Sequence, residues 1–173
     1  MPTLAVSVVV PTFNRVDVLP RALASALEQV RPGDEIIVVD DGSTDGTAAL
    51  LATYGAPVRA VFTPNAGAGA ARNVGIAEAR RPLVAFLDSD DEWMPGSLEA
   101  RRRLLEARPD VLYCFSAFAI SLPDGRTLRR YLPHWHADPR PWSEILAPGA
   151  RLAALVGPDV PHPDAQVHSG DLY

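Results

Sequence analysis

The sequence contains no lysine, so arginine alone supplies its positive charge. It also has a single cysteine, Cys114, and no apolar run near the roughly 20 residues that a transmembrane helix needs. One cysteine excludes an internal disulfide, and its apolar neighbours indicate a buried thiol rather than a nucleophile. The first residues lack the basic region and the small-residue cleavage site of a signal peptide. These absences favour a cytoplasmic protein without a transmembrane segment, and they argue against redox chemistry.

The charge balance limits the partners of the chain. Its 173 residues carry 16 arginines against 21 acidic residues, a net charge of −5, and 47% of them are hydrophobic. This composition is sufficient for one globular domain with a buried core. An acidic surface argues against nonspecific nucleic-acid binding. An acidic pocket that holds a phosphorylated ligand needs a metal cation or well-placed arginines to offset the repulsion.

Strand and helix patterns alternate over the first 112 residues. Short aliphatic runs predict four strands buried on both faces, at residues 5–10, 35–39, 58–62 and 83–87. Helical spacing of apolar or small residues lies between these runs and again over residues 97–108. Short connections between alternating strands and helices predict an α/β fold, with a mostly parallel sheet flanked by helices.

The pattern changes beyond residue 110. Residues 111–121, the turn "PDGR" and residues 127–132 predict an antiparallel hairpin at or near a sheet edge. From Pro133 onward, prolines and all four histidines crowd the chain, and we expect irregular structure apart from one short helix within residues 142–157. We therefore divide a single domain into an α/β core, residues 1–132, and a proline-rich segment, residues 133–173.

Polar residues gather where the predicted strands end. Ligands of parallel sheets bind outside the carboxyl ends of the strands. The four exits are residues 11–15, 40–43, 65–67 and 88–91, and residues 88–92 hold four carboxylates within five positions. Helix capping explains single residues such as Ser43, but it does not require four carboxylates at one exit. Because such charges repel one another without a positive partner, the pattern favours a ligand site.

The glycine-rich segment "NAGAGAARNVG" opens a predicted helix. It follows the third strand rather than the first, and its glycines are out of register for a dinucleotide-binding loop. Its small residues would let the helix N-terminus approach a ligand closely. Arg72 on this helix could reach a diphosphate.

Four segments in this order, "SVVVPTFNR", "IIVVDDGSTDGT", "NAGAGAARNVGI" and "FLDSDDEWMPGSL", resemble the nucleotide-sugar half of family 2 glycosyltransferases. The resemblance covers about half of the chain. It implies the Rossmann-like GT-A fold and an inverting enzyme. It also implies a UDP-, GDP- or dTDP-linked sugar donor and a hydroxyl acceptor such as a saccharide or lipid-linked saccharide.

The resemblance also implies roles for single residues. "DSD" is similar to the DxD element of the family, which places Asp90 at a divalent cation, Asp88 near the ribose or the metal, Asp41 at the nucleotide base, and Phe13 beneath that base. Mn²⁺ or Mg²⁺ suits such a site, because both prefer carboxylate and phosphate oxygens. Asp91 and Glu92 are either structural or contacts of the acceptor hydroxyl. The expected nucleotide-sugar-binding residues are Pro11, Thr12, Phe13, Asn14, Arg15, Asp41, Asn65, Arg72, Asp88, Ser89 and Asp90.

An inverting transferase also needs a base that takes the proton of the acceptor hydroxyl. In the family this base is an Asp in a later acidic motif, and the candidate is Asp171 in "HSGDLY", with Asp159 and Asp164 as alternatives. The segment lacks the second acidic residue of the motif and the helix that follows it. We therefore expect a truncated catalytic domain in which residues 133–173 form an incomplete acceptor-side segment.

Two other functions remain open. One is a non-catalytic nucleotide-sugar-binding fragment whose base region is missing. The other is a sugar-phosphate nucleotidyltransferase, although a chain without lysine and with "PTFNR" as its first loop argues against that class. The arginines between residues 101 and 108 form either a solvated helix face or a peripheral contact with the inner membrane face. The pattern specifies no oligomeric state.

Overall fold

A computed structural model describes residues 4–116, 119–122, 124–128, 150–151, 159 and 166–167. The chain divides into two compact units, Met1–Leu98 and Glu99–Tyr173. The division predicted at residue 132 stays a prediction, and Asp171 lies outside the described residues.

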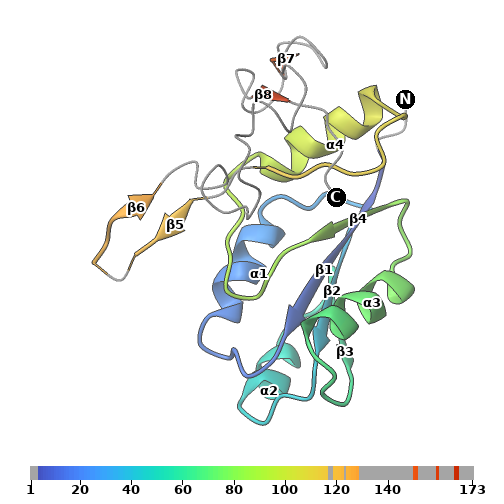
Figure 1. Cartoon of the computed structure of the whole chain (residues 1–173). Coiled ribbons are helices and arrows are strands. Elements are labelled where there is room, and N and C mark those ends of the chain that lie inside the picture. Colours follow the sequence, from blue (N-terminus) through green and yellow to red (C-terminus); the bar gives the residue numbers. More distant parts are fainter. Residues whose placement is uncertain are drawn as a thin grey trace. The chain divides into compact units, whose positions relative to one another are not determined.

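The first unit contains a four-stranded parallel sheet, as the alternating patterns predicted (Figure 1). Its strands are β1 (Val6–Thr12), β2 (Glu35–Asp40), β3 (Val58–Phe62) and β4 (Leu83–Phe86), and they lie in the order β3-β2-β1-β4. The connecting helices are α1 (Leu19–Leu27), α2 (Thr47–Leu51) and α3 (Ala68–Glu78). The chain moves from β1 to β2 and β3 in one direction and then crosses back to β4. The carboxyl ends of the neighbouring strands β1 and β4 therefore form the topological switch point, where α/β proteins bind ligands.

Only the two inner strands are buried on both faces. On one face Val8 and Ile36 pack with Leu23 of α1, and on the other Ile37 packs with Ala71 of α3. Strands β3 and β4 are partly exposed, so the prediction that all four strands are doubly buried was wrong for these two. Each of them has a sheet neighbour on one side only among the described strands.

Helix α3 lies unusually close to β1. A Cβ atom on Gly75 would stand 2.2 Å from Cγ1 of Val9, so only glycine fits at this crossing. The helix begins near the carboxyl ends of the strands and ends near their amino ends, where Arg59 binds Glu78 at 2.6 Å. One helix thus contacts both ends of the sheet (Figure 1).

A buried carboxylate organises the amino ends of the strands. Glu35 Oε1 accepts hydrogen bonds from Ser7 Oγ at 2.7 Å and from the Arg80 N–H at 2.8 Å. Glu35 also lies within 3.9 Å of the guanidinium groups of Arg59 and Arg81. Burial opposes ionisation, but these hydrogen bonds and charges outweigh it and lower the pKa of Glu35. The charge of Glu35 is therefore held inside the fold by protein groups.

The second unit contains most of α4 (Ser97–Ala107) and two short antiparallel pairs. Strands β5 (Ile120–Ser121) and β6 (Thr127–Leu128) form a hairpin as predicted, but as a two-stranded sheet of their own, and the first strand predicted over residues 111–121 is wrong at residues 111–116, which lie outside any strand. Strand β7 (Ala150–Arg151) pairs with β8 (Gln166–Val167). The helix expected within residues 142–157 is wrong at residues 150–151, because these pair as a strand. Cys114 is partly buried, and burial raises the pKa of its thiol. Across the described residues, no helix is both long and apolar enough to cross a membrane.

Candidate functional site

Strand β1 ends later than the sequence predicted. Pro11 and Thr12 pair with Val39 and Asp40 of β2, so they belong to the strand and not to the loop. Proline is tolerated there because the backbone polar groups of successive β1 residues point alternately toward β2 and toward β4. The Thr12 carbonyl faces β2, where it accepts the Asp41 N–H, so the Pro11 nitrogen faces β4, which has already ended at Phe86. The longer strand carries Phe13 directly to the edge of the sheet.

Asn14 shapes the loop that follows β1. It adopts a positive φ of 52°, a conformation that asparagine tolerates better than most residues. Its N–H donates to Ser43 Oγ, and its side-chain oxygen accepts the Thr44 N–H, both at 2.8 Å. These bonds tie the loop after β1 to the loop after β2. The neighbouring Phe13 keeps 45% of its surface exposed.

Asp41 stands at the carboxyl end of β2 and is only 3% exposed. Its two carboxylate oxygens accept the N–H groups of Ala66 and Gly67, at 2.9 and 2.7 Å, just before α3 begins. Asn65 donates its side-chain amide to the Asp41 carbonyl at 3.0 Å. Asp41 therefore fixes the approach to α3, in addition to facing the cavity described below.

The acidic segment after β4 meets arginines from other elements. Asp88 Oδ1 lies 2.5 Å from Nη2 of Arg72 on α3, and Asp90 Oδ2 lies 3.7 Å from Nη2 of Arg15 in the loop after β1. These four side chains stay between 35% and 55% exposed. For Asp91, burial and then the charges of Asp88 and Asp90 raise the pKa of the carboxyl. The segment thus retains uncompensated negative charge despite its arginine partners.

Helix α1 holds the residues that follow this acidic segment. Ser25 Oγ accepts the Trp93 N–H at 3.0 Å, and the side chain of Gln29 accepts the Leu98 N–H at 3.1 Å. Arg21 of α1 pairs with Glu92. Neither Ser25 nor Gln29 was among the predicted site residues. Their only signal is that two polar residues stand four positions apart, Ser25 within α1 and Gln29 just beyond its end.

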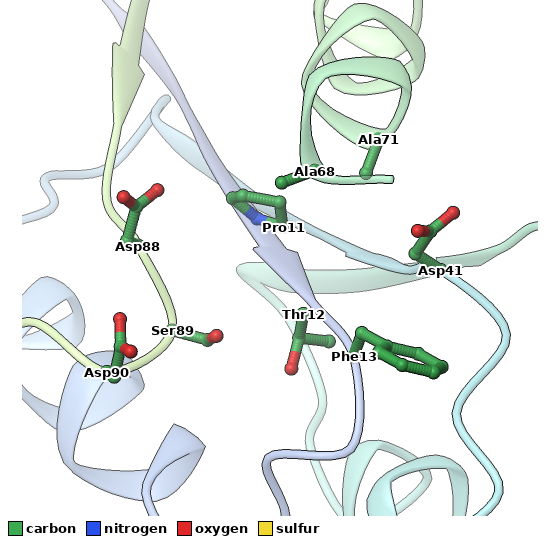
Figure 2. Close-up of a pocket in the computed structure, with 9 residues that line it drawn as sticks. All are labelled: Pro11, Thr12, Phe13, Asp41, Ala68, Ala71, Asp88, Ser89 and Asp90. Atoms are coloured by element: carbon green, nitrogen blue, oxygen red, sulfur yellow. The ribbon is translucent and has the colours of Figure 1, made fainter. Parts of the chain in front are cut away.

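These elements enclose one cavity at the carboxyl ends of β1, β2 and β4, with about 420 Å³ of space partly open to solvent. In Figure 2, Asp88, Ser89 and Asp90 lie to one side of Pro11 and Thr12, and Phe13 and Asp41 lie to the other. The lining residues are Pro11, Thr12, Phe13, Asp41, Ala68, Ala71, Asp88, Ser89 and Asp90.

Seven of the eleven predicted nucleotide-sugar-binding residues thus line one cavity, and Ala68 and Ala71 join them without having been predicted. Three more predicted residues, Arg15, Asn65 and Arg72, bind a lining residue instead. Asn14 binds Ser43 and Thr44 of the loop after β2. The predicted positions therefore converge in space.

Asp88 and Asp90 are the cavity's candidates for a divalent cation. Carboxylate oxygens suit Mg²⁺ and Mn²⁺, which often take one or two carboxylates and complete their shell with phosphate and water oxygens. Within the described part of the chain, no group of three or more histidine, cysteine, aspartate or glutamate residues is placed to hold a metal alone. The donor set thus fits a cation that arrives with a phosphorylated ligand.

Comparisons with known proteins agree on one family. The family model described as Glycosyl transferase family 2 matches residues 7–152. The putative teichuronic acid biosynthesis glycosyltransferase TuaG of Bacillus subtilis is 35% identical over 131 residues, which are 73% of this chain and 52% of that protein. The succinoglycan biosynthesis protein ExoO of Rhizobium meliloti is 40% identical over 128 residues, 73% of this chain and 36% of that protein. The chain therefore spans about half, or less, of the length of these relatives.

Solved structures give the same result. The crystal structure of S. aureus TarS 1-349 in complex with UDP-GlcNAc matches with a TM-score of 0.57 and 29% identity, over 61% of this chain and 32% of that one. TarS 1-349 in complex with UDP matches with the same TM-score of 0.57 at 24% identity, over 76% of this chain and 48% of that one. The second likeness extends the shared fold over more of the chain.

Proposed function

The chain belongs to glycosyl transferase family 2, and from this we propose that it moves a sugar from a nucleoside-diphosphate donor to a hydroxyl acceptor, with inversion and with a divalent cation. The observation that carries the proposal is the single cavity lined at one side by Phe13 and Asp41 and at the other by Asp88 and Asp90. The similar TarS structure that contains UDP-GlcNAc supports a nucleotide-sugar donor.

The nucleotide base belongs at the Phe13 side of the cavity. An aromatic ring that is 45% exposed at a cavity wall offers a face on which a base can stack. Asp41 lies on the same side, where it already accepts the N–H groups of Ala66 and Gly67. A carboxylate fixed in this way is preorganised to accept a further hydrogen bond from the base.

The diphosphate belongs at the acidic side, where Asp88 and Asp90 would hold Mn²⁺ or Mg²⁺. Such a cation supplies Lewis-acid stabilisation of the negative charge that grows on the leaving nucleoside diphosphate. Ser89, between the two carboxylates, is 7% exposed and lines the cavity. Arg15 and Arg72 lie next to these carboxylates and can donate to phosphate oxygens.

The acceptor side is assigned to the remainder of the chain. A base would remove the proton of the acceptor hydroxyl while the hydroxyl oxygen attacks the anomeric carbon. The bond from that carbon to the diphosphate would break on the opposite face of the sugar. We assign this base to Asp171. The acceptor would be a saccharide or a lipid-linked saccharide, and the reaction would take place in the cytoplasm or at the inner membrane face.

A thermal-shift panel of UDP-, GDP- and dTDP-sugars, with and without Mn²⁺, tests the donor site. We expect at least one donor to raise the melting temperature only with Mn²⁺, because ligands that bind the folded state stabilise it. Asp90→Ala should abolish this shift. Asp110→Ala, which removes an exposed carboxylate paired with Arg108, should retain it.

Absence of stabilisation by every donor would refute the proposal. Donor turnover by the chain would exclude the alternative of a binding fragment without catalytic activity. Binding of donor without turnover would favour that alternative.

A further inference from the structure

We propose that Arg72 and Arg15 are exchange partners: they neutralise Asp88 and Asp90 before the donor binds, and they move to the diphosphate when the cation arrives with it. The proposal rests on the proposed function and deepens it. It concerns how the site binds cation and donor together. It rests on two ion pairs between different elements at one cavity.

The geometry places each guanidinium beside a cavity carboxylate. Arg72 comes from α3 and lies 2.5 Å from Asp88, and Arg15 comes from the loop after β1 and lies 3.7 Å from Asp90. Both carboxylates line the cavity, and neither arginine does. All four side chains are at least 35% exposed, so no buried contact prevents the pairs from separating.

The charges explain why the arginines stand there. Asp88, Asp90, Asp91 and Glu92 place four carboxylates within five positions, and two of them line the cavity. Without positive neighbours their mutual repulsion would oppose the loop conformation. The two arginines reduce the repulsion in the absence of a ligand.

A bare divalent cation must therefore compete with the arginines for the same oxygens. Its positive charge repels the guanidinium groups, and without a phosphate these groups have no new anionic partner in the cavity. A donor diphosphate provides that partner, because a guanidinium donates well to phosphate oxygens. Cation and donor should consequently bind with positive coupling, and each should tighten the binding of the other by the same factor.

The test measures Mn²⁺ binding by electron paramagnetic resonance and UDP binding by calorimetry, with the 173-residue chain and its variants. In Arg72→Gln, Mn²⁺ alone should bind about threefold more tightly, because a partly exposed competing charge is gone. UDP with saturating Mn²⁺ should bind about tenfold more weakly, because a charged donor to phosphate is lost. The two effects have opposite signs.

Arg21→Gln is the matched control. It breaks an exposed ion pair with Glu92 in the same acidic segment, but neither residue lines the cavity. Both affinities should stay within about twofold of the wild type. Circular dichroism melting verifies that each variant is folded. If Arg72→Gln does not fold, Arg15→Gln takes its place, with the same two signs and smaller effects.

Weaker binding of both Mn²⁺ and UDP in the variant would overturn the exchange, since it would make Arg72 a mere support for Asp88. Unchanged binding of either ligand would overturn it as well. Failure of the proposed function has a different signature, because the wild-type chain itself would then bind no UDP at saturating Mn²⁺.

Discussion

Carboxylates occupy both ends of the parallel sheet, but they are buried at the amino ends of the strands and half exposed at the carboxyl ends. At the amino ends, Glu35 is 8% exposed and Asp34 is 6% exposed, and Asp34 accepts the N–H groups of Val6 and Arg31, each at 2.8 Å. At the carboxyl ends, Asp88 and Asp90 keep about half of their side-chain surface exposed.

The difference lies in the groups that satisfy each charge. Backbone N–H groups and a buried hydroxyl cannot leave the amino-end carboxylates without disturbing the strands. Exposed guanidinium groups can leave Asp88 and Asp90 at little cost, because such ion pairs contribute about 1 kcal/mol or less. The amino-end charges therefore stabilise the fold, and the carboxyl-end charges remain available to a ligand.

The strongest test of this contrast is the removal of Glu35. Glu35→Ala removes the acceptor of the buried Ser7 Oγ and the closer of the two acceptors of the Arg80 N–H, which keeps its 3.2 Å bond to Ser7 Oγ, so we expect the free energy of unfolding to fall by about 3 kcal/mol. Urea denaturation measures this loss. UDP binding by the remaining folded protein should not change, and a large loss of UDP affinity would contradict the separation of the two ends.

The effect of Glu35→Ala should also depend on pH. Because the folded pKa of Glu35 lies below its ordinary value of 4.5, its ionic contribution is complete above that pH and is lost as the pH falls through the folded pKa. The difference from the wild type should shrink on acidification. Glu28→Ala, at an exposed glutamate of the same unit, should change stability by less than about 0.5 kcal/mol at any of these pH values.

A second test removes an aromatic ring at the carboxyl ends. Phe13→Ala should weaken UDP binding about tenfold through lost stacking, with little change in the unfolding midpoint, since the ring is 45% exposed. Phe62→Ala is the matched control, because Phe62 is 59% exposed at the end of β3 and does not line the cavity. Calorimetry with UDP and Mn²⁺ compares them, and equal losses in both variants would remove Phe13 from the base site.

The smallest effect concerns Asp91. Because its folded pKa is raised, its ionised form opposes folding at neutral pH, and Asp91→Asn should raise the melting temperature by about 1 °C at pH 7. The gain should vanish below the ordinary aspartate value of 3.8, where Asp91 is protonated in both states. Asp110→Asn should give no gain, because a hydrogen bond from Arg108 lowers the pKa of Asp110. Destabilisation by Asp91→Asn would show that this carboxylate supports the loop.

The sequence predicted the parallel sheet and most of the cavity, because both depend on local patterns. Aliphatic runs define the strands, and in a parallel sheet the residues after each run must meet at one edge. The end of β1 was wrong because proline usually ends a strand. Here the nitrogen of Pro11 faces β4, and β4 ends at Phe86, which pairs with Val9, two positions before the proline.

The residues that support the site could not be predicted in the same way. Ser25 and Gln29 act on Trp93 and Leu98, which are 68 and 69 residues away in the chain. Asn14 similarly binds Ser43, 29 residues further on. A polar residue that serves a distant backbone group leaves no periodic signal, so its role becomes visible only when the fold brings the partners together.

The close crossing of α3 over β1 has a consequence for how this protein can change in evolution. Any side chain at position 75 would collide with Cγ1 of Val9, so these two positions constrain each other. Alanine at 75 requires a smaller residue at 9, and homologous chains should show the two substitutions together. Val9→Ala should likewise restore the stability that Gly75→Ala removes. Substitutions in this helix and in this strand are therefore expected to covary.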